Sequence, residues 1–265
     1  MSQTLPRLPV IRTLGGCGGT LISRLFSALP RVIVLSETNP RSANLFGFHL
    51  NPLRQLRQWN PQLMDQVLEF DDAELGEPGR FGAMLTGVMA TAASANYRLI
   101  VRDFNYADYI GVPFIWPVPG NSSLDIALAG RFRARSIYVV RHPADQLASL
   151  RSHSALAQVL TASRFIAGSL AFLQDRTDAP CFRYEDLLAS PERQFSAMCE
   201  GIGIPFEPSA LSRFADITQV TGSLTRAAET LIEPGKPQAG AAQARAELEA
   251  EPGYERLLSA LGYAA

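Results

Sequence analysis

Short apolar runs alternate with helix-like patterns along most of the chain. The runs that read as buried strands are 9–14, 32–35, 97–101, 136–140 and 181–184. After the first run, Leu21, Leu25 and Leu29 recur at helical spacing, and Pro30 ends that pattern. Strands that alternate with helices favour a parallel sheet covered on both faces, which is a three-layer α/β/α fold. In such folds, ligands bind beyond the carboxyl ends of the strands.

The remaining pattern completes one domain spanning residues 1–265. Further helices are predicted at 81–96, 122–133, from Pro143 onward, and at 154–174, 191–201 and 254–261. Residues 39–80 read as short helical segments and loops, and 102–120 read as a long loop rich in proline and aromatic residues. Loops of that length are usually functional. Residues 218–245 are rich in small residues, which favours a mobile flap, a tail or both.

Charge and cysteine content narrow the function classes. The net charge is −1, so nothing in the total favours nucleic acid or an anionic membrane, and an anion site must be a local cluster. Only one of the 24 basic residues is a lysine, Lys236, so arginines must bind anions. Cys17, Cys181 and Cys199 show neither paired nor metal-ligand spacing, which argues against a disulfide framework and structural zinc.

No apolar stretch approaches the roughly 20 residues that a membrane span requires. The segment before Cys17 carries arginines and prolines where a signal peptide needs an unbroken apolar stretch. We therefore expect a cytoplasmic protein without a membrane span.

Four glycines stand in five positions at 15–19, after the first strand and before the first helix. Backbone N–H groups of such a loop converge on an anion at a helix N-terminus, where the helix dipole favours negative charge. The alternative is a tight turn without a ligand. Thr20 follows Gly19 directly, so the lysine that holds a nucleoside triphosphate is missing, which disfavours an ATP-dependent phosphotransferase.

Two later segments add an arginine, a hydroxyl and an aromatic residue. Arg141 leaves the strand 136–140, and Ser149 follows eight residues later in the next helix, so both could close on one phosphate. Between them, His142 and Pro143 read as helix-start residues. The third segment, 182–192, contains Tyr184 followed by Glu185 and Asp186.

Together and in this order, the three segments resemble the sulfotransferases that use 3′-phosphoadenosine 5′-phosphosulfate (PAPS), particularly the bacterial ones. The resemblance spans 9–207 and implies the sulfotransferase variant of the P-loop nucleoside triphosphate hydrolase-like fold. It implies that Arg141 and Ser149 bind the 3′-phosphate and that Tyr184 lies beside the adenine. The 5′-phosphosulfate would be bound by Gly16, Cys17, Gly18, Gly19, Thr20 and Leu21. A C-terminal loop at 218–237, with Arg226, would cover the nucleotide.

The resemblance does not identify the catalytic cation directly, because many relatives carry a basic residue where this chain has Gly16. Arg102, at the end of the strand 97–101, is the first candidate for the missing cation, ahead of Arg12 and Lys236. Glu37 is the candidate general base because it follows the strand 32–35 and should project into the same cleft. Its alternative role is to cap a loop or to pair with Arg41. Asp103 is the second candidate base.

Sulfuryl transfer depends on positioning and charge stabilisation, so we expect no metal. The acceptor would be a hydroxyl or amine of a small molecule or glycoconjugate, with 39–80 and 103–121 as pocket segments and a homodimer left open. Aromatic residues there suggest an apolar or glycosidic acceptor: Phe46, Phe48, Trp59, Phe104, Tyr106, Tyr109, Phe114 and Trp116. Two other functions remain open, an ATP-dependent phosphotransferase and a protein that binds 3′,5′-phosphoadenosine without turnover.

Overall fold

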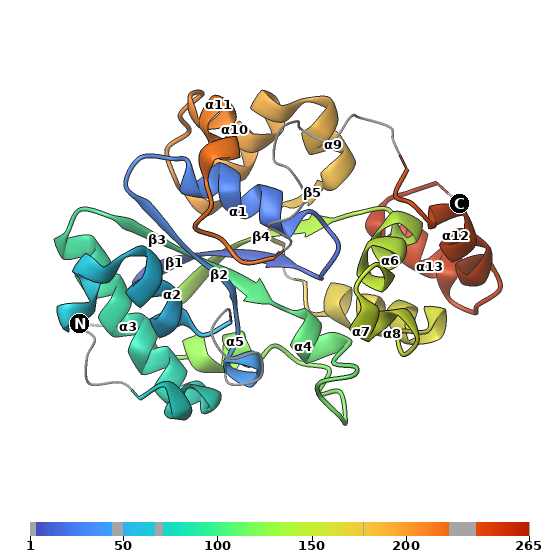
Figure 1. Cartoon of the computed structure of the whole chain (residues 1–265), viewed down its shortest axis with the longest axis horizontal. Coiled ribbons are helices and arrows are strands. Elements are labelled where there is room, and N and C mark those ends of the chain that lie inside the picture. Colours follow the sequence, from blue (N-terminus) through green and yellow to red (C-terminus); the bar gives the residue numbers. More distant parts are fainter. Residues whose placement is uncertain (1–3, 44–49, 67–70, 177, 223–236, 265) are drawn as a thin grey trace.

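A computed structural model describes residues 4–43, 50–66, 71–176, 178–222 and 237–264. Within these residues, five parallel strands form one sheet in the order β2-β3-β1-β4-β5. The strands are β1 (Arg7–Thr13), β2 (Val32–Thr38), β3 (Arg98–Phe104), β4 (Arg133–Val140) and β5 (Cys181–Arg183). The central strand β1 therefore lies between β3 and β4, and the loops that follow these three strands meet at one edge of the sheet (Figure 1).

Helices cover both faces of the sheet, as the alternating pattern predicted (Figure 1). Apolar residues of β1 and β3, such as Val10 and Val101, pack on one face against α2 (Pro52–Trp59), α3 (Pro78–Ser94) and α5 (Ser123–Leu128). Ile11 and Ile100 pack on the opposite face against α1 (Gly19–Ser27) and α10 (Pro191–Ile202). The predicted three-layer α/β/α class with a parallel sheet is confirmed.

A third apolar cluster lies beyond the β4 side of the sheet. It joins α4 (Tyr106–Tyr109), α6 (Pro143–Arg151), α7 (Ser154–Ala157), α8 (Ala162–Gln174), α12 (Ala241–Glu249) and α13 (Tyr254–Leu261). The remaining helices are α9 (Tyr184–Ala189), α11 (Ala210–Arg213) and the short 3₁₀ helices η1 (Pro40–Ser42), η2 (Pro61–Gln66), η3 (Asp72–Gly76) and η4 (Phe214–Asp216). The C-terminal helices thus pack beside the loop that follows β4.

Four predictions of local structure were wrong. The loop predicted at 102–120 begins only after Phe104 and contains α4, whose residues Tyr106 and Tyr109 are buried in the third cluster. The helix predicted at 122–133 ends at Leu128, because Gly130 has a φ of 70° and the chain then enters β4. The helix predicted at 154–174 is two helices, and the second begins where the Thr161 side chain accepts a bond from the Arg164 amide.

The fourth prediction, that 218–245 is a flap, a tail or both, is wrong only at the end of the segment. Its last residues belong to α12, which packs on α6 with Ala241, Ala244 and Leu248 buried. Residues 223–236, including Arg226 and Lys236, lie outside the described residues, as do Phe46, Phe48 and His49.

Candidate functional site

The glycine loop turns the chain from β1 into α1. Gly16 and Gly18 have φ angles of 83° and 79°, in the left-handed region that glycine adopts without steric cost. Helix α1 begins at Gly19, so the N–H groups of its first turn face the loop and have no partner within the helix. The loop thus precedes a helix N-terminus, the arrangement from which the sequence predicted an anion site.

Tyr184, the first residue of α9, packs directly on the loop. Its ring is buried, and a Cβ atom added to Gly18 would overlap it. Glycine is therefore required at position 18 for two independent reasons, the positive φ and the aromatic ring.

Replacing Gly18 with alanine is expected to destabilise the fold more than replacing Gly130. Both glycines have positive φ, of 79° and 70°, which costs an alanine about 1–2 kcal/mol, but nothing lies within 4 Å of a Cβ at Gly130. Only Gly18→Ala must also displace the Tyr184 ring. Thermal denaturation of both variants checks this, and equal melting temperatures would show that the Tyr184 contact is not rigid.

Arg141 connects the loop to Tyr184. Its Nη1 donates to the Gly16 carbonyl at 3.0 Å, and its guanidinium lies 5.0 Å from the centre of the Tyr184 ring. On α6, Gln146 Nε2 donates to the Gly15 carbonyl at 2.9 Å, and Ser149 follows one turn later. The predicted Arg141 and Tyr184 are thus brought together at the loop, and Ser149 lies on the helix that contacts it.

Arg102 lies on the other side of the loop and is 3% exposed. Its Nε donates to Ser23 Oγ at 2.8 Å, and its Nη2 donates to Ser36 Oγ at 2.9 Å. A Cβ added to Gly19 would overlap its Nη1. Two arginines, from the ends of the strands on either side of β1, therefore flank the loop.

Glu37 forms an ion pair with Arg102, with 3.3 Å between Oε1 and Nη2. The register of β2 against β3 shifts between Leu35 and Thr38, and Glu37 has a φ of 56°. This irregularity lets both Ser36 and Glu37 reach Arg102, although consecutive side chains of a regular strand point to opposite faces. The alternative pairing with Arg41 is not observed, because Arg41 binds Asp108 at 2.5 Å.

Asp103 lies on the face of β3 opposite Arg102 and is fully buried. Its carboxylate accepts bonds from Asn39 Nδ2 at 2.9 Å and Asn105 Nδ2 at 2.8 Å and pairs with Arg12 at 3.5 Å. Burial raises the pKa of Asp103 to about 7, with a further contribution from the charge of Asp108. The structure therefore places the two candidate bases on opposite sides of the sheet.

Arg12, the second candidate cation, belongs to the same buried network as Asp103. It donates to the side chains of Asp125, Ser122 and Ser136. These bonds engage all three guanidinium nitrogens, whereas the Arg102 guanidinium lies against Gly19, so Arg102 is the better candidate.

Three hydroxyl side chains at the site were not singled out from the sequence: Ser23, Ser36 and Thr221. Thr221 Oγ1 donates to Ser36 Oγ at 2.9 Å and accepts from Arg102 Nη2 at 3.3 Å, and Thr20 Oγ1 donates to the Thr221 carbonyl at 3.4 Å. Ser36 directly precedes Glu37, so its position after a strand was a usable signal. Thr221 lies within the loop at 218–237 that was predicted to cover the nucleotide, although it was not named there. Ser23 offered no signal, because tertiary packing alone brings it to Arg102.

The Cys17 side chain is buried, and its thiol stays protonated. It is 2% exposed, and burial raises the pKa of its thiol to about 12.

Among the described residues, no group of three or more His, Cys, Asp or Glu side chains could hold a metal ion. In the same part of the chain, no helix has both the length and the apolar character of a membrane span.

No protein-family model matches the chain, and no curated protein matches it. Several solved structures match the chain. The sulfotransferase domain from the Synechococcus PCC 7002 olefin synthase is 18% identical, with a TM-score of 0.66 over 100% of this chain and 98% of that chain. The sulfotransferase domain from the curacin biosynthetic pathway is 16% identical, with a TM-score of 0.58 over 98% and 99%.

At these identities the comparison establishes the fold. The chain has the fold of sulfotransferase domains over its whole length. The resemblance found in the sequence is confirmed at that level.

Proposed function

We propose that this protein is a sulfotransferase that uses PAPS as donor and a hydroxyl or amine as acceptor. The observation that carries the proposal is the pair of arginines, Arg102 and Arg141, on either side of a glycine loop at a helix N-terminus. A nucleotide with phosphate groups at both its 5′ and 3′ positions needs cations at two separate places. The sulfotransferase fold of the chain supports the same assignment.

In the proposed complex, Gly16 to Leu21 bind the 5′-phosphosulfate and Arg141 with Ser149 binds the 3′-phosphate. Tyr184, which already packs on Gly18 and Arg141, would lie beside the adenine. A planar guanidinium suits the 3′-phosphate because it can donate two parallel hydrogen bonds. The loop at 218–237, with Arg226, is the proposed cover of this nucleotide, and its residues 223–236 lie outside the described residues.

In the reaction, the acceptor oxygen or nitrogen attacks sulfur, and the bond from sulfur to the bridging phosphate oxygen breaks. The electron pair of that bond stays on the phosphate, where negative charge grows in the transition state. Arg102 and the N–H groups of the loop would stabilise this charge, since they are fixed in a buried site before the reaction begins.

Glu37 would accept the proton that the acceptor loses. It is the carboxylate beside Arg102, whereas Asp103 is enclosed by Arg12 and two asparagines on the other face of β3. Asp103 stays the alternative base. We propose a small apolar or glycosidic acceptor, and of the aromatic residues that suggested it, Phe114 and Trp116 are exposed by 38% and 72%.

Sulfuryl transfer is expected to continue when divalent metals are removed, because fixed arginines and N–H groups supply the charge stabilisation. Sulfur-labelled PAPS is incubated with the protein, with a cell extract as acceptor source, in the presence and absence of EDTA. Equal formation of labelled product supports the proposal. Product that forms only with Mg²⁺ would contradict the metal-free site.

The same assay tests the two other functions. Consumption of ATP in place of PAPS would identify a phosphotransferase. Tight binding of 3′,5′-phosphoadenosine without any label transfer would identify a binding protein.

A further inference from the structure

The C-terminal residues return to the loop that contains Arg141. The Tyr263 hydroxyl donates to Glu185 Oε2 at 2.7 Å, and the other oxygen of that carboxylate, Oε1, accepts from the His142 backbone N–H at 2.9 Å. Glu185 thus bridges the C-terminus to the residue that directly follows Arg141. The three residues come from α9, from the turn after β4 and from the chain beyond α13.

The Tyr263 ring is held from two sides. The Arg183 guanidinium lies 4.6 Å from its centre, and the His142 ring meets it edge-on at 5.1 Å. Gly262, with a φ of 72°, ends α13 against the Arg183 side chain, where a Cβ would lie 2.7 Å from Nη2. Burial and the neighbouring Glu185 both raise the pKa of Tyr263, so its hydroxyl keeps the proton that it donates.

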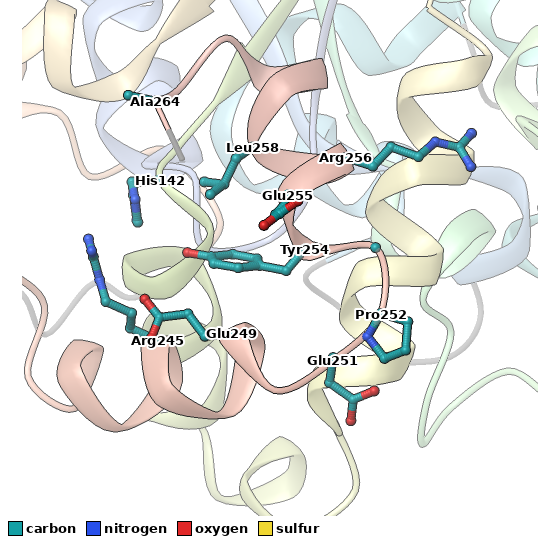
Figure 2. Close-up of a pocket in the computed structure, with 11 residues that line it drawn as sticks. His142, Arg245, Glu249, Glu251, Pro252, Tyr254, Glu255, Arg256, Leu258 and Ala264 are labelled. Atoms are coloured by element: carbon teal, nitrogen blue, oxygen red, sulfur yellow. The ribbon is translucent and has the colours of Figure 1, made fainter.

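His142 is fixed through its side chain as well. Its Nδ1 accepts from the Ala144 N–H at 3.3 Å and so caps α6. Residues of α12 and α13, together with His142 and Ala264, line a cavity of about 620 Å³. Figure 2 shows the His142 ring and Ala264, the residue after Tyr263, on the same side of it. The turn from Arg141 to Pro143 is therefore braced by Glu185, Tyr263 and the start of α6.

Glu185 also couples this brace to the aromatic residue of the site. It directly follows Tyr184, whose ring contacts Gly18 and lies under the Arg141 guanidinium. Contact with Gly18 keeps the Tyr184 ring in place, so a change in the position of Glu185 would act mainly on the turn that carries Arg141 and on the 3′-phosphate that it binds. A displacement of about 1 Å is enough to weaken such a site.

We propose that Tyr263 is a positioning residue, which holds Arg141 through Glu185 and the His142 backbone in the geometry that binds the nucleotide 3′-phosphate. The proposal rests on the proposed function, because it assigns Arg141 to that phosphate. Tyr263 itself would touch neither the nucleotide nor the acceptor.

The test compares two nucleotides in Tyr263→Phe, which removes the hydroxyl and keeps the ring. The dissociation constant of 3′,5′-phosphoadenosine is expected to rise about threefold to tenfold, which is less than the full effect of a lost hydrogen bond to a charged group because Tyr263 acts on Arg141 indirectly. The dissociation constant of adenosine 5′-monophosphate, which has no 3′-phosphate, should stay unchanged. Calorimetric titration measures both, and in Arg141→Ala the second substitution Tyr263→Phe should add nothing further.

Tyr97→Phe is the matched control. Tyr97 is also a half-buried tyrosine under an arginine, Arg31 at 5.8 Å, but it precedes β3 at the opposite end of the strand. Loss of both nucleotides equally in Tyr263→Phe would reveal a general structural role and overturn the proposal, as would unchanged affinity for both. If the unaltered protein does not prefer 3′,5′-phosphoadenosine to adenosine 5′-monophosphate, the proposed function itself fails instead.

Discussion

Replacing Arg141 with alanine is expected to raise the dissociation constant of 3′,5′-phosphoadenosine about a hundredfold or more while the protein stays folded. Removing one partner of a buried charge-assisted pair costs about 2–5 kcal/mol, and each 1.4 kcal/mol is tenfold in affinity. Arg141 is 6% exposed and is already ordered by the Gly16 carbonyl and the Tyr184 ring, so little side-chain entropy is lost on binding. Calorimetric titration measures the affinity.

The nucleotide affinities of two further variants are compared with that of Arg141→Ala. Ser149→Ala removes a neutral hydroxyl and should weaken binding by about threefold to tenfold. Arg164→Ala is the control, because Arg164 also lies over an aromatic ring, 4.9 Å from the centre of Trp116, but on α8. Unchanged affinity in a folded Arg141→Ala protein would remove the 3′-phosphate from this part of the site.

The sequence predicted the strands and the glycine loop because their signals are local. An apolar run followed by four glycines constrains the backbone whatever surrounds it, and β1 and α1 lie where that pattern placed them. Helix α4 had no such signal. Tyr106 and Tyr109 form a single helical turn because the third cluster buries them, so tertiary packing decided their conformation.

The residues of the candidate site also fall into those that a local sequence signal predicted and those that only tertiary packing brings together. Arg141, Gly16 and Tyr184 could be grouped because each lies in a motif of recognisable order. The bridge from Tyr263 to Glu185 joins residues 78 positions apart, and no spacing rule relates them. Likewise, Glu37 reaches Arg102 only because β2 departs from regular register before Thr38, a feature that the apolar pattern of the strand does not encode.

Because the irregular register of β2 brings Glu37 beside Arg102, replacing Glu37 is the most direct test of the proposed general base. Glu37→Gln is expected to lower turnover about a hundredfold or more, the usual scale for a lost general base, with unchanged affinity for 3′,5′-phosphoadenosine. The amide keeps the length of the side chain and an oxygen that can accept from Arg102, so the binding site should persist. Initial rates at saturating PAPS give turnover, and calorimetry gives the nucleotide affinity.

Asp103→Asn is the comparison that separates the two candidate bases. Asp103 lies on the opposite face of β3 and pairs with Arg12, so its replacement should lower the melting temperature but leave turnover per folded molecule largely intact. Rates are therefore normalised to the folded fraction from thermal denaturation. If turnover collapses in Asp103→Asn and survives in Glu37→Gln, Asp103 is the base, and the Glu37 ion pair serves only to hold Arg102 against the loop.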